Sequence, residues 1–322
     1  MEAGNNNEKF PRIVRSQFEQ LGTEIDIQVV AEDEAQVIVA EKNIQEIKKL
    51  YLEFVRIFSR FDLKSELSEL NLAVGRFNLA SQHMCEIVSQ SLEYNKKTNG
   101  FYDPRILEVL EKIGYADDFE KGIRQLAEKG YADDQNFFLN CGLVEDLKIE
   151  KNTVFFGTRM DFSGIAKGYI TDQIAEFLIQ QKWKNFLVDS GGDMFMCGVD
   201  EDGKKWTVNV EGIDEKKLIF VLDNNAIATS GIGKRRWEIA GKRMNHIINP
   251  KNPEQFSFDL KSVSVIAEST TEADVWAKTL FLMGKEDGML YAREHDIATV
   301  ILDSRGTAWI SPKAKEYSYK NI

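Results

Sequence analysis

Apolar and polar residues alternate along residues 21–31, LGTEIDIQVVA, with the two-residue period of a strand that buries one face. Residues 34–58 change to helical spacing, because apolar side chains recur there every three or four positions. These apolar positions include Val37, Ile44, Ile47, Leu50, Phe54 and Ile57. A second helix is predicted over residues 81–100, where Asn99-Gly100 is a typical C-terminal stop. The pattern therefore predicts a strand followed by two helices.

The second half of the chain predicts more strands than helices. Residues 160–182 are typical of a strand that turns into a helix, and residues 269–284 of a helix capped by Ser269 or Thr270. The other predicted strand segments lie at residues 185–198, 204–212, 217–231, 261–267 and 298–312. Strands and helices interleave without the regular βαβ period of a doubly wound sheet. The pattern therefore favours an α+β protein.

Length and composition indicate a folded globular protein. The chain has 322 residues, of which 43% are hydrophobic and 29% charged. No linker divides it, so we assign residues 1–20 to a poorly ordered N-terminal extension and residues 21–322 to a single domain. The formal charge of −11 argues against a nucleic-acid partner, which requires a basic surface. An acidic protein can still bind a phosphorylated ligand locally.

The sequence gives weak indications of location. No run reaches about 18 apolar residues, so no transmembrane segment is predicted. The N-terminus lacks the apolar core of a signal peptide, and no cysteine near it could carry a lipid anchor. As written, the chain is expected to be cytoplasmic. A chain trimmed of an export signal would look the same, and such a protein would be exported.

Two glycine motifs have both structural and functional interpretations. In GIAKGYITDQ, Lys167 lies between two glycines where a helix is expected to begin. Backbone N–H groups at such a turn can bind a phosphate, with Lys167 as counter-charge, but a solvated lysine at a helix start is commoner. In VDSGGDM, Gly191 and Gly192 permit close approach of the backbone to a ligand, or simply a tight turn.

Three further motifs are equally ambiguous when each is taken alone. ATSGIGKRRW joins Thr229, Ser230 and Gly231 to a basic cluster that could be a solvated surface. His246, in NHIINP, is either a satisfied buried histidine or a general base. NGFYDPR could be a packed turn or could hold a flat heterocycle.

EADVWAKTLF places Asp274 and Lys278 one helical turn apart. Such a pair is often a surface ion pair, which contributes only about 0.3–0.5 kcal/mol. The alternatives are half of a metal site or the remnant of one.

Together and in this order, the motifs closely resemble the FAD:protein FMN transferase family of the ApbE type over about residues 21–310. The motifs that carry the resemblance are LGT, FSRFDLKSELSELN, TNGFYDP, MDFSGIAKGYITD, FLVDSGGDM, AIATSG, HIINP and SVSVIAESTTEADVWAKTLFLMG. The resemblance implies mixed, T-fold-like sheets with packed helices and a substrate cleft between two lobes. It also implies an enzyme that binds FAD and, with Mg²⁺, cleaves its pyrophosphate. The FMN half is then joined by a phosphoester bond to a threonine or serine hydroxyl of an acceptor flavoprotein, and AMP is released.

The resemblance also implies roles for individual residues. His246 and Asp274 are the expected catalytic residues, and Asp274 with the main-chain oxygen of Gly164 is the expected metal site. The expected FAD contacts are Leu21, Phe61, Phe101, Tyr102, Asp103, Asp161, Lys167, Gly191, Gly192, Thr229, Ser230 and Gly231.

One position departs from the family pattern in a way that bears on the metal. Lys278 stands where the family has a metal-binding threonine, and Thr279 is rotated by about 100° around the helix. Because a protonated lysine cannot ligate a metal, we expect weaker or rearranged Mg²⁺ binding. Two alternatives to transfer therefore stay open: hydrolysis of FAD to FMN and AMP, or FAD binding with little catalysis.

Overall fold

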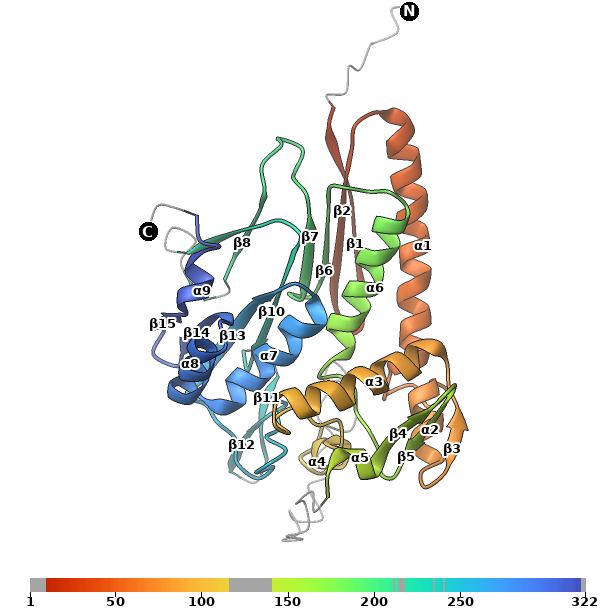
Figure 1. Ribbon diagram of the computed structural model, residues 1–322, viewed down its shortest axis with the longest axis vertical. Coiled ribbons are helices and arrows are strands. Elements are labelled where there is room, and N and C mark those ends of the chain that lie inside the picture. The colour runs from red at the N-terminus through yellow and green to blue at the C-terminus, as the bar shows by residue number, and fades with distance from the viewer. Residues whose placement is uncertain are drawn as a thin grey trace, which may run out of the picture.

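The computed structural model describes residues 10–115, 141–210, 212–213, 218–233, 235–239 and 241–319. Its centre is an eight-stranded sheet with the order β1-β2-β6-β7-β10-β13-β14-β15, in which every neighbouring pair is antiparallel (Figure 1). These strands are β1 (Arg12–Gln20), β2 (Thr23–Ala31), β6 (Phe186–Ser190), β7 (Met194–Cys197), β10 (Asn225–Gly231), β13 (Leu260–Ala267), β14 (Ala298–Asp303) and β15 (Ala308–Ile310). The mixed helix and sheet architecture confirms the predicted α+β class.

Strands β1 and β2 form a hairpin at one end of this sheet. They pair from Arg12–Ala31 to Gln20–Thr23. The two-residue turn between them consists of Leu21 and Gly22, with φ angles of 58° and 64°, as a tight hairpin turn requires. Residues 12–20 therefore lie in a strand of the main sheet and are not part of the poorly ordered extension that the sequence predicts.

Three of the four long helices pack against this sheet, and the fourth, α3, packs against a smaller one. Helix α1 (Glu34–Phe58) is capped by Asp33, α3 (Gln82–Lys97) by Ser81 and α7 (Thr270–Met283) by Ser269, which confirms one of the two predicted caps. Helix α6 (Ala166–Gln180) begins without a side-chain cap, and residues 160–165 form no strand before it, contrary to the prediction for residues 160–182. The shorter helices are α2 (Glu66–Leu72), α4 (Leu107–Lys112), α5 (Leu143–Asp146), α8 (Lys285–Glu294) and α9 (Pro312–Lys315).

Both faces of the main sheet are buried, as its side chains show. Ala226 and Ala228 of β10 join the core beneath α7 and α8, whereas Ile227 between them packs on the opposite face. That opposite core contains the hairpin of β8 (Trp206–Asn209) and β9 (Ile219–Leu222). Because successive side chains of a strand point to opposite faces, β10 contacts both cores. Because both faces are buried, these strands do not show a clear alternation of apolar and polar residues.

Smaller sheets complete the fold. Strands β3 (Phe77–Leu79), β5 (Thr153–Phe156) and β4 (Leu147–Glu150) form one, close to α2, α3 and α5 (Figure 1). Strands β11 (Arg236–Ile239) and β12 (Lys242–Asn245) form another hairpin. Among the described residues, no helix has both the length and the apolar character needed to cross a lipid bilayer.

Candidate active site

Lys167 lies at the start of α6, and its ammonium contacts Asp193 in the turn between β6 and β7. Asp193 is 1% exposed, so this pair is sheltered from water. Burial alone would lower the pKa of Lys167, but the carboxylates of Asp193 and Asp274 raise it above its ordinary value. The lysine, whose side chain is 27% exposed, is therefore a positive charge held at a fixed, partly sheltered position, as the phosphate-binding interpretation of GIAKGYITDQ requires.

A second pair of the same kind lies on α7. The ammonium of Lys278 contacts Asp274 Oδ1, and their side chains are 22% and 1% exposed. Burial raises the pKa of Asp274, while Lys278 and Lys167 act in the opposite direction. The pair is therefore not an ordinary surface ion pair. Its sheltered position also makes the attraction much stronger than in water.

Gly164 lies beside Lys278, directly before α6. A Cβ placed on Gly164 would lie 3.2 Å from Tyr102 Cε2 and 3.8 Å from Lys278 Cδ. The alkyl stem of Lys278 thus lies along the same residue whose main-chain oxygen we expected to bind the metal. Lys278 therefore contacts Asp274 and lies beside Gly164, the two residues expected to hold the metal, and their role as ligands stays a prediction.

His246 follows β12 and lies in the same electrostatic field. Burial lowers its pKa to about 3, and the positive charges of Arg235, Lys278 and Lys167 contribute to this shift. Its Nδ1 lies 3.3 Å from the main-chain oxygen of Arg235, which can only accept a hydrogen bond. The neutral ring therefore carries its hydrogen on Nδ1 and keeps a lone pair on Nε2. Lys167 and Lys278 therefore lie near both His246 and Asp274.

The double glycine forms a turn at the edge of this centre. Gly191 has a φ of +71°, and a Cβ on it would lie 2.0 Å from Thr23 Oγ1, so no larger residue fits there. Gly192 has open space where its Cβ would stand, and its N–H donates to Asp189 Oδ1 at 2.6 Å. Burial raises the pKa of Asp189 to about 6. Leu21 lies two residues from Thr23, in the neighbouring hairpin turn.

Arg60 anchors a second part of the site. Its Nε lies 3.0 Å from Asp161 Oδ2, and both side chains are almost fully buried. The guanidinium is held against the rings of Phe61 and Tyr115, at 4.1 and 4.5 Å from their centroids. Phe61 remains 40% exposed. The exposed ring of Phe61 is suited to contact with a flat ring, but the roles of Phe61 and Asp161 in FAD binding stay predictions.

The side chains of Tyr102 and Asp103 are engaged in the core. The Tyr102 hydroxyl lies 2.9 Å from Ser91 Oγ, and Asp103 forms an ion pair with Arg105 at 2.8 Å. All four side chains are buried. Any contact of Tyr102 or Asp103 with FAD would therefore be made by a ring face or by main-chain atoms.

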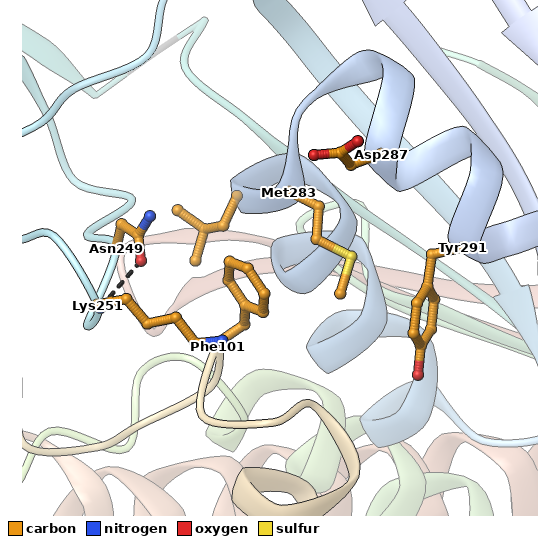
Figure 2. Close-up of a pocket in the computed structure, with 7 residues that line it drawn as sticks. Phe101, Asn249, Lys251, Met283, Asp287 and Tyr291 are labelled. Carbon is orange, nitrogen blue, oxygen red and sulfur yellow. Dashed lines mark hydrogen bonds between the residues drawn. The ribbon is translucent and has the colours of Figure 1, made fainter.

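Phe101, by contrast, opens onto a pocket of about 350 Å³. Figure 2 shows its ring between Lys251 and Met283, with Asp287 and Tyr291 on α8 close by. The Lys251 ammonium lies 4.0 Å from the centre of the Phe101 ring. The pocket thus joins the loop before α4 to the end of α7, which are remote in the sequence.

Thr229, Ser230 and Gly231 form the end of β10. The Thr229 hydroxyl lies 2.8 Å from Ser264 Oγ of β13, and Ser230 is buried. A Cβ on Gly231 would lie 2.7 Å from the main-chain oxygen of Lys261, so close pairing of the two strands accounts for this glycine. Their expected contact with FAD stays a prediction.

Sequence reasoning missed Asp193, Arg60 and Arg235 as functional candidates. Each lies within a quoted motif, directly after Gly192, directly before Phe61 and inside the basic cluster after β10. The signal that could have found Asp193 is a buried carboxylate beside a half-buried lysine. That signal requires knowing that α6 packs on the turn between β6 and β7.

Comparison with known proteins agrees with this architecture. The ApbE family profile matches residues 21–301. An FAD:protein FMN transferase of Haemophilus influenzae is 24% identical over 320 residues, which cover 96% of this chain and 92% of that protein. One from Vibrio cholerae is 28% identical and covers 82% of this chain and 80% of its own.

Solved structures show the same fold. The flavin transferase ApbE of Vibrio cholerae superposes with a TM-score of 0.77 at 24% identity, covering 95% of this chain and 99% of that one. The apo flavinyl transferase ApbE of Pseudomonas stutzeri gives 0.82 at 19% identity, covering 97% and 98%. Fold and site thus define the class of flavin-transferase-like α+β proteins. The chain belongs to the ApbE family.

Proposed function

We propose that this protein transfers the FMN half of FAD to a threonine or serine hydroxyl of an acceptor flavoprotein. Membership of the ApbE family, whose curated relatives are FAD:protein FMN transferases, supports the reaction. The observation that carries the assignment is the sheltered cluster of two ion pairs, in which Lys167 and Lys278 lie close to Asp274 and His246. A diphosphate is the part of FAD that such a centre would hold.

The reaction exchanges the phosphoanhydride bond in the diphosphate of FAD for a phosphoester bond to the acceptor. The acceptor oxygen attacks the phosphorus of the FMN half, and the bond from that phosphorus to the bridging oxygen breaks. The bridging oxygen leaves on AMP with the electron pair, and the hydroxyl proton passes to a base. Negative charge grows on the phosphate oxygens as this happens, so fixed positive groups stabilise the transition state more than the ground state.

The centre supplies that charge from several elements. Lys167 and Lys278 each keep an ammonium in a sheltered site, and Arg235 lies near enough to act on His246. Helix α6 begins without a side-chain cap, and although the N–H of Ala166 donates to the Phe162 oxygen, those of Lys167 and Gly168 have no main-chain partner in the described chain and could face an anion. These groups would orient the diphosphate of FAD at the start of α6.

His246 is the proposed base. Its Nδ1 is directed to the oxygen of Arg235, so Nε2 keeps the lone pair needed to take the acceptor proton. Because burial and nearby cations lower the pKa of His246 to about 3, the ring is neutral at physiological pH. A neutral base beside fixed cations can accept a proton once the negative diphosphate is bound.

The residues at the expected metal position do not fit a divalent ion. Asp274 Oδ1 is held by Lys278, whose stem lies along Gly164. Asp274 Oδ2 has no hydrogen-bond partner in the described chain, but the Lys278 ammonium already brings a positive charge to this carboxylate. Within the described ranges, no three His, Cys, Asp or Glu side chains form a metal cluster. We therefore assign no step to Mg²⁺, and its involvement stays a prediction.

The test is incubation with FAD, with and without a flavoprotein that offers a threonine or serine target. Transfer predicts AMP release together with flavin fluorescence that stays on the acceptor in a denaturing gel. Release of AMP and free FMN without labelled acceptor would instead support the hydrolase alternative. FAD that stays intact through long incubation would support binding without catalysis.

A further inference from the structure

We infer that the ammonium of Lys278 takes the place of a divalent cation, so that this protein holds the diphosphate of FAD without Mg²⁺. The identity of the ligand rests on the proposed function. The claim about the cation rests on the centre itself and can be tested without FAD.

Lys278 occupies the place where the expected metal ion would bind. Its ammonium contacts Asp274 Oδ1, and its stem passes 3.8 Å from the Cβ position of Gly164. A cation bound by Asp274 and the main chain of Gly164 would have to occupy the same small region. The lysine already brings a positive charge there, on a side chain that is only 22% exposed.

The charges of the centre are already balanced without a metal ion. The centre contains two buried carboxylates, Asp193 and Asp274, and each contacts one ammonium. A divalent ion would add two positive charges to a neutral centre and would lie beside Lys278 and Lys167. Like charges within a few ångströms in a sheltered site repel strongly. A threonine at position 278 would leave Asp274 with less compensation and would favour a divalent ion.

The first experiment uses Mg²⁺ alone. Wild type, Lys278→Thr and Lys97→Thr are melted with and without millimolar Mg²⁺ at matched ionic strength. Lys97 forms an i,i+4 pair with Glu93 on the exposed surface of α3, so it is a matched control. We expect Mg²⁺ to raise the melting temperature of Lys278→Thr only, since a ligand stabilises the state that binds it. Equal stabilisation of the wild type would overturn the inference.

The second experiment measures FAD affinity in EDTA and in Mg²⁺. Wild type should show the same Kd in both, whereas Lys278→Thr should bind about tenfold more weakly in EDTA and recover in Mg²⁺. A wild-type affinity that falls about tenfold in EDTA would contradict the inference. Failure of FAD to bind in both buffers would overturn the proposed function, while the melting experiment would still decide the role of Lys278.

A folding defect would not block the test. If Lys278→Thr does not fold, Lys278→Met keeps the length of the stem and removes its charge. Lys278→Met should also lose FAD affinity in EDTA. An unchanged affinity would overturn the inference, because the charge would then make no contribution.

Discussion

At the scale of single residues, the site is built from charges that water would normally surround. Asp161, Asp193 and Asp274 are each less than 3% exposed, and each is matched by one cation. Taking a carboxylate out of water costs several kcal/mol unless a partner compensates it. The cations are therefore needed for folding before any substrate binds. Substitutions of these residues should change both the stability of the fold and the binding of the substrate.

Arg60 gives the clearest residue-scale prediction. Arg60→Met should lower the free energy of unfolding by about 3–5 kcal/mol, because Asp161 would remain buried without its partner. The double variant Arg60→Met/Asp161→Asn should recover much of that loss, since it removes both charges. Urea unfolding of the two single variants and the double variant measures the coupling. Additive losses would contradict a direct interaction.

His246 gives a prediction for pH. Its pKa is lowered from 6.5 to about 3 in the folded protein, so between these values only the unfolded chain binds the proton. The free energy of unfolding should therefore fall as pH drops through this window, by about 1.4 kcal/mol per unit. His246→Asn should remove this part of the acid sensitivity, amounting to roughly 2 kcal/mol between pH 7 and pH 5. Urea unfolding at both pH values, with His295→Asn as control, would detect it. Identical pH dependence of His246→Asn and wild type would refute it.

At the scale of elements, the site depends on how α6 meets α7. Asp172 of α6 accepts hydrogen bonds from the main-chain N–H groups of Thr270 and Thr271, at 2.7 and 2.9 Å. It thereby helps to cap α7 and fixes the two helices together. Since Lys167 begins one helix and Asp274 lies on the other, this contact sets the spacing of the charged centre.

Gly168 tests that contact. A Cβ at this position would lie 2.7 Å from both the Thr270 oxygen and Thr271 Cα, which are main-chain atoms that cannot move aside. Gly168→Ala should lower stability by about 1–2 kcal/mol, because overpacking outweighs the roughly 1 kcal/mol that alanine gains in a helix. Gly233→Ala, which would place its Cβ in open space, is the control for denaturant unfolding. A stabilised Gly168→Ala would show that the helices separate easily.

At the scale of the whole molecule, the net acidity of the chain contrasts with the group of cations around His246. The chain carries a formal charge of −11, yet its lysines and arginine near His246 are concentrated where an anion would bind. The proposed ligand would join α6, α7 and the turn between β6 and β7. We therefore expect FAD to stabilise the domain as one unit.

Thermal or chemical unfolding with increasing FAD measures this. At FAD concentrations of about 100 times Kd, the free energy of unfolding should rise by about 2.7 kcal/mol. Free AMP at the same concentration is a control for the adenylate half alone and should stabilise less. No dependence on FAD would contradict the assignment of the centre to this ligand.

The sequence predicted elements well where one segment contains its own pattern. Residues 34–58 were expected to be a helix, and α1 spans Glu34–Phe58, because its apolar stripe and the Asp33 cap are local. Strand β1 was missed, since its stability comes from pairing with β2 rather than from its own residues. The strand predicted before α6 is absent. Its apolar residues are buried, but they lie in a loop rather than in a strand.

The site was predictable only as a set of motifs. Lys167 and Asp193 are 26 residues apart, and His246 and Lys278 are farther apart still, so their proximity depends on sheet topology. Local spacing did indicate the pair on α7, because residues four apart in a helix are neighbours. It did not indicate that this pair is buried. The order of the eight motifs supplied the family resemblance, and that resemblance implied that these distant residues share one site.

Lys278 in α7 has a consequence for how this family evolves. A mutation at codon 278 alone would leave Asp274 without its partner, so this position and the demand for a metal should change together during evolution. Relatives with a hydroxyl residue at the equivalent place should depend on magnesium supply. Lineages that keep lysine there should tolerate magnesium scarcity.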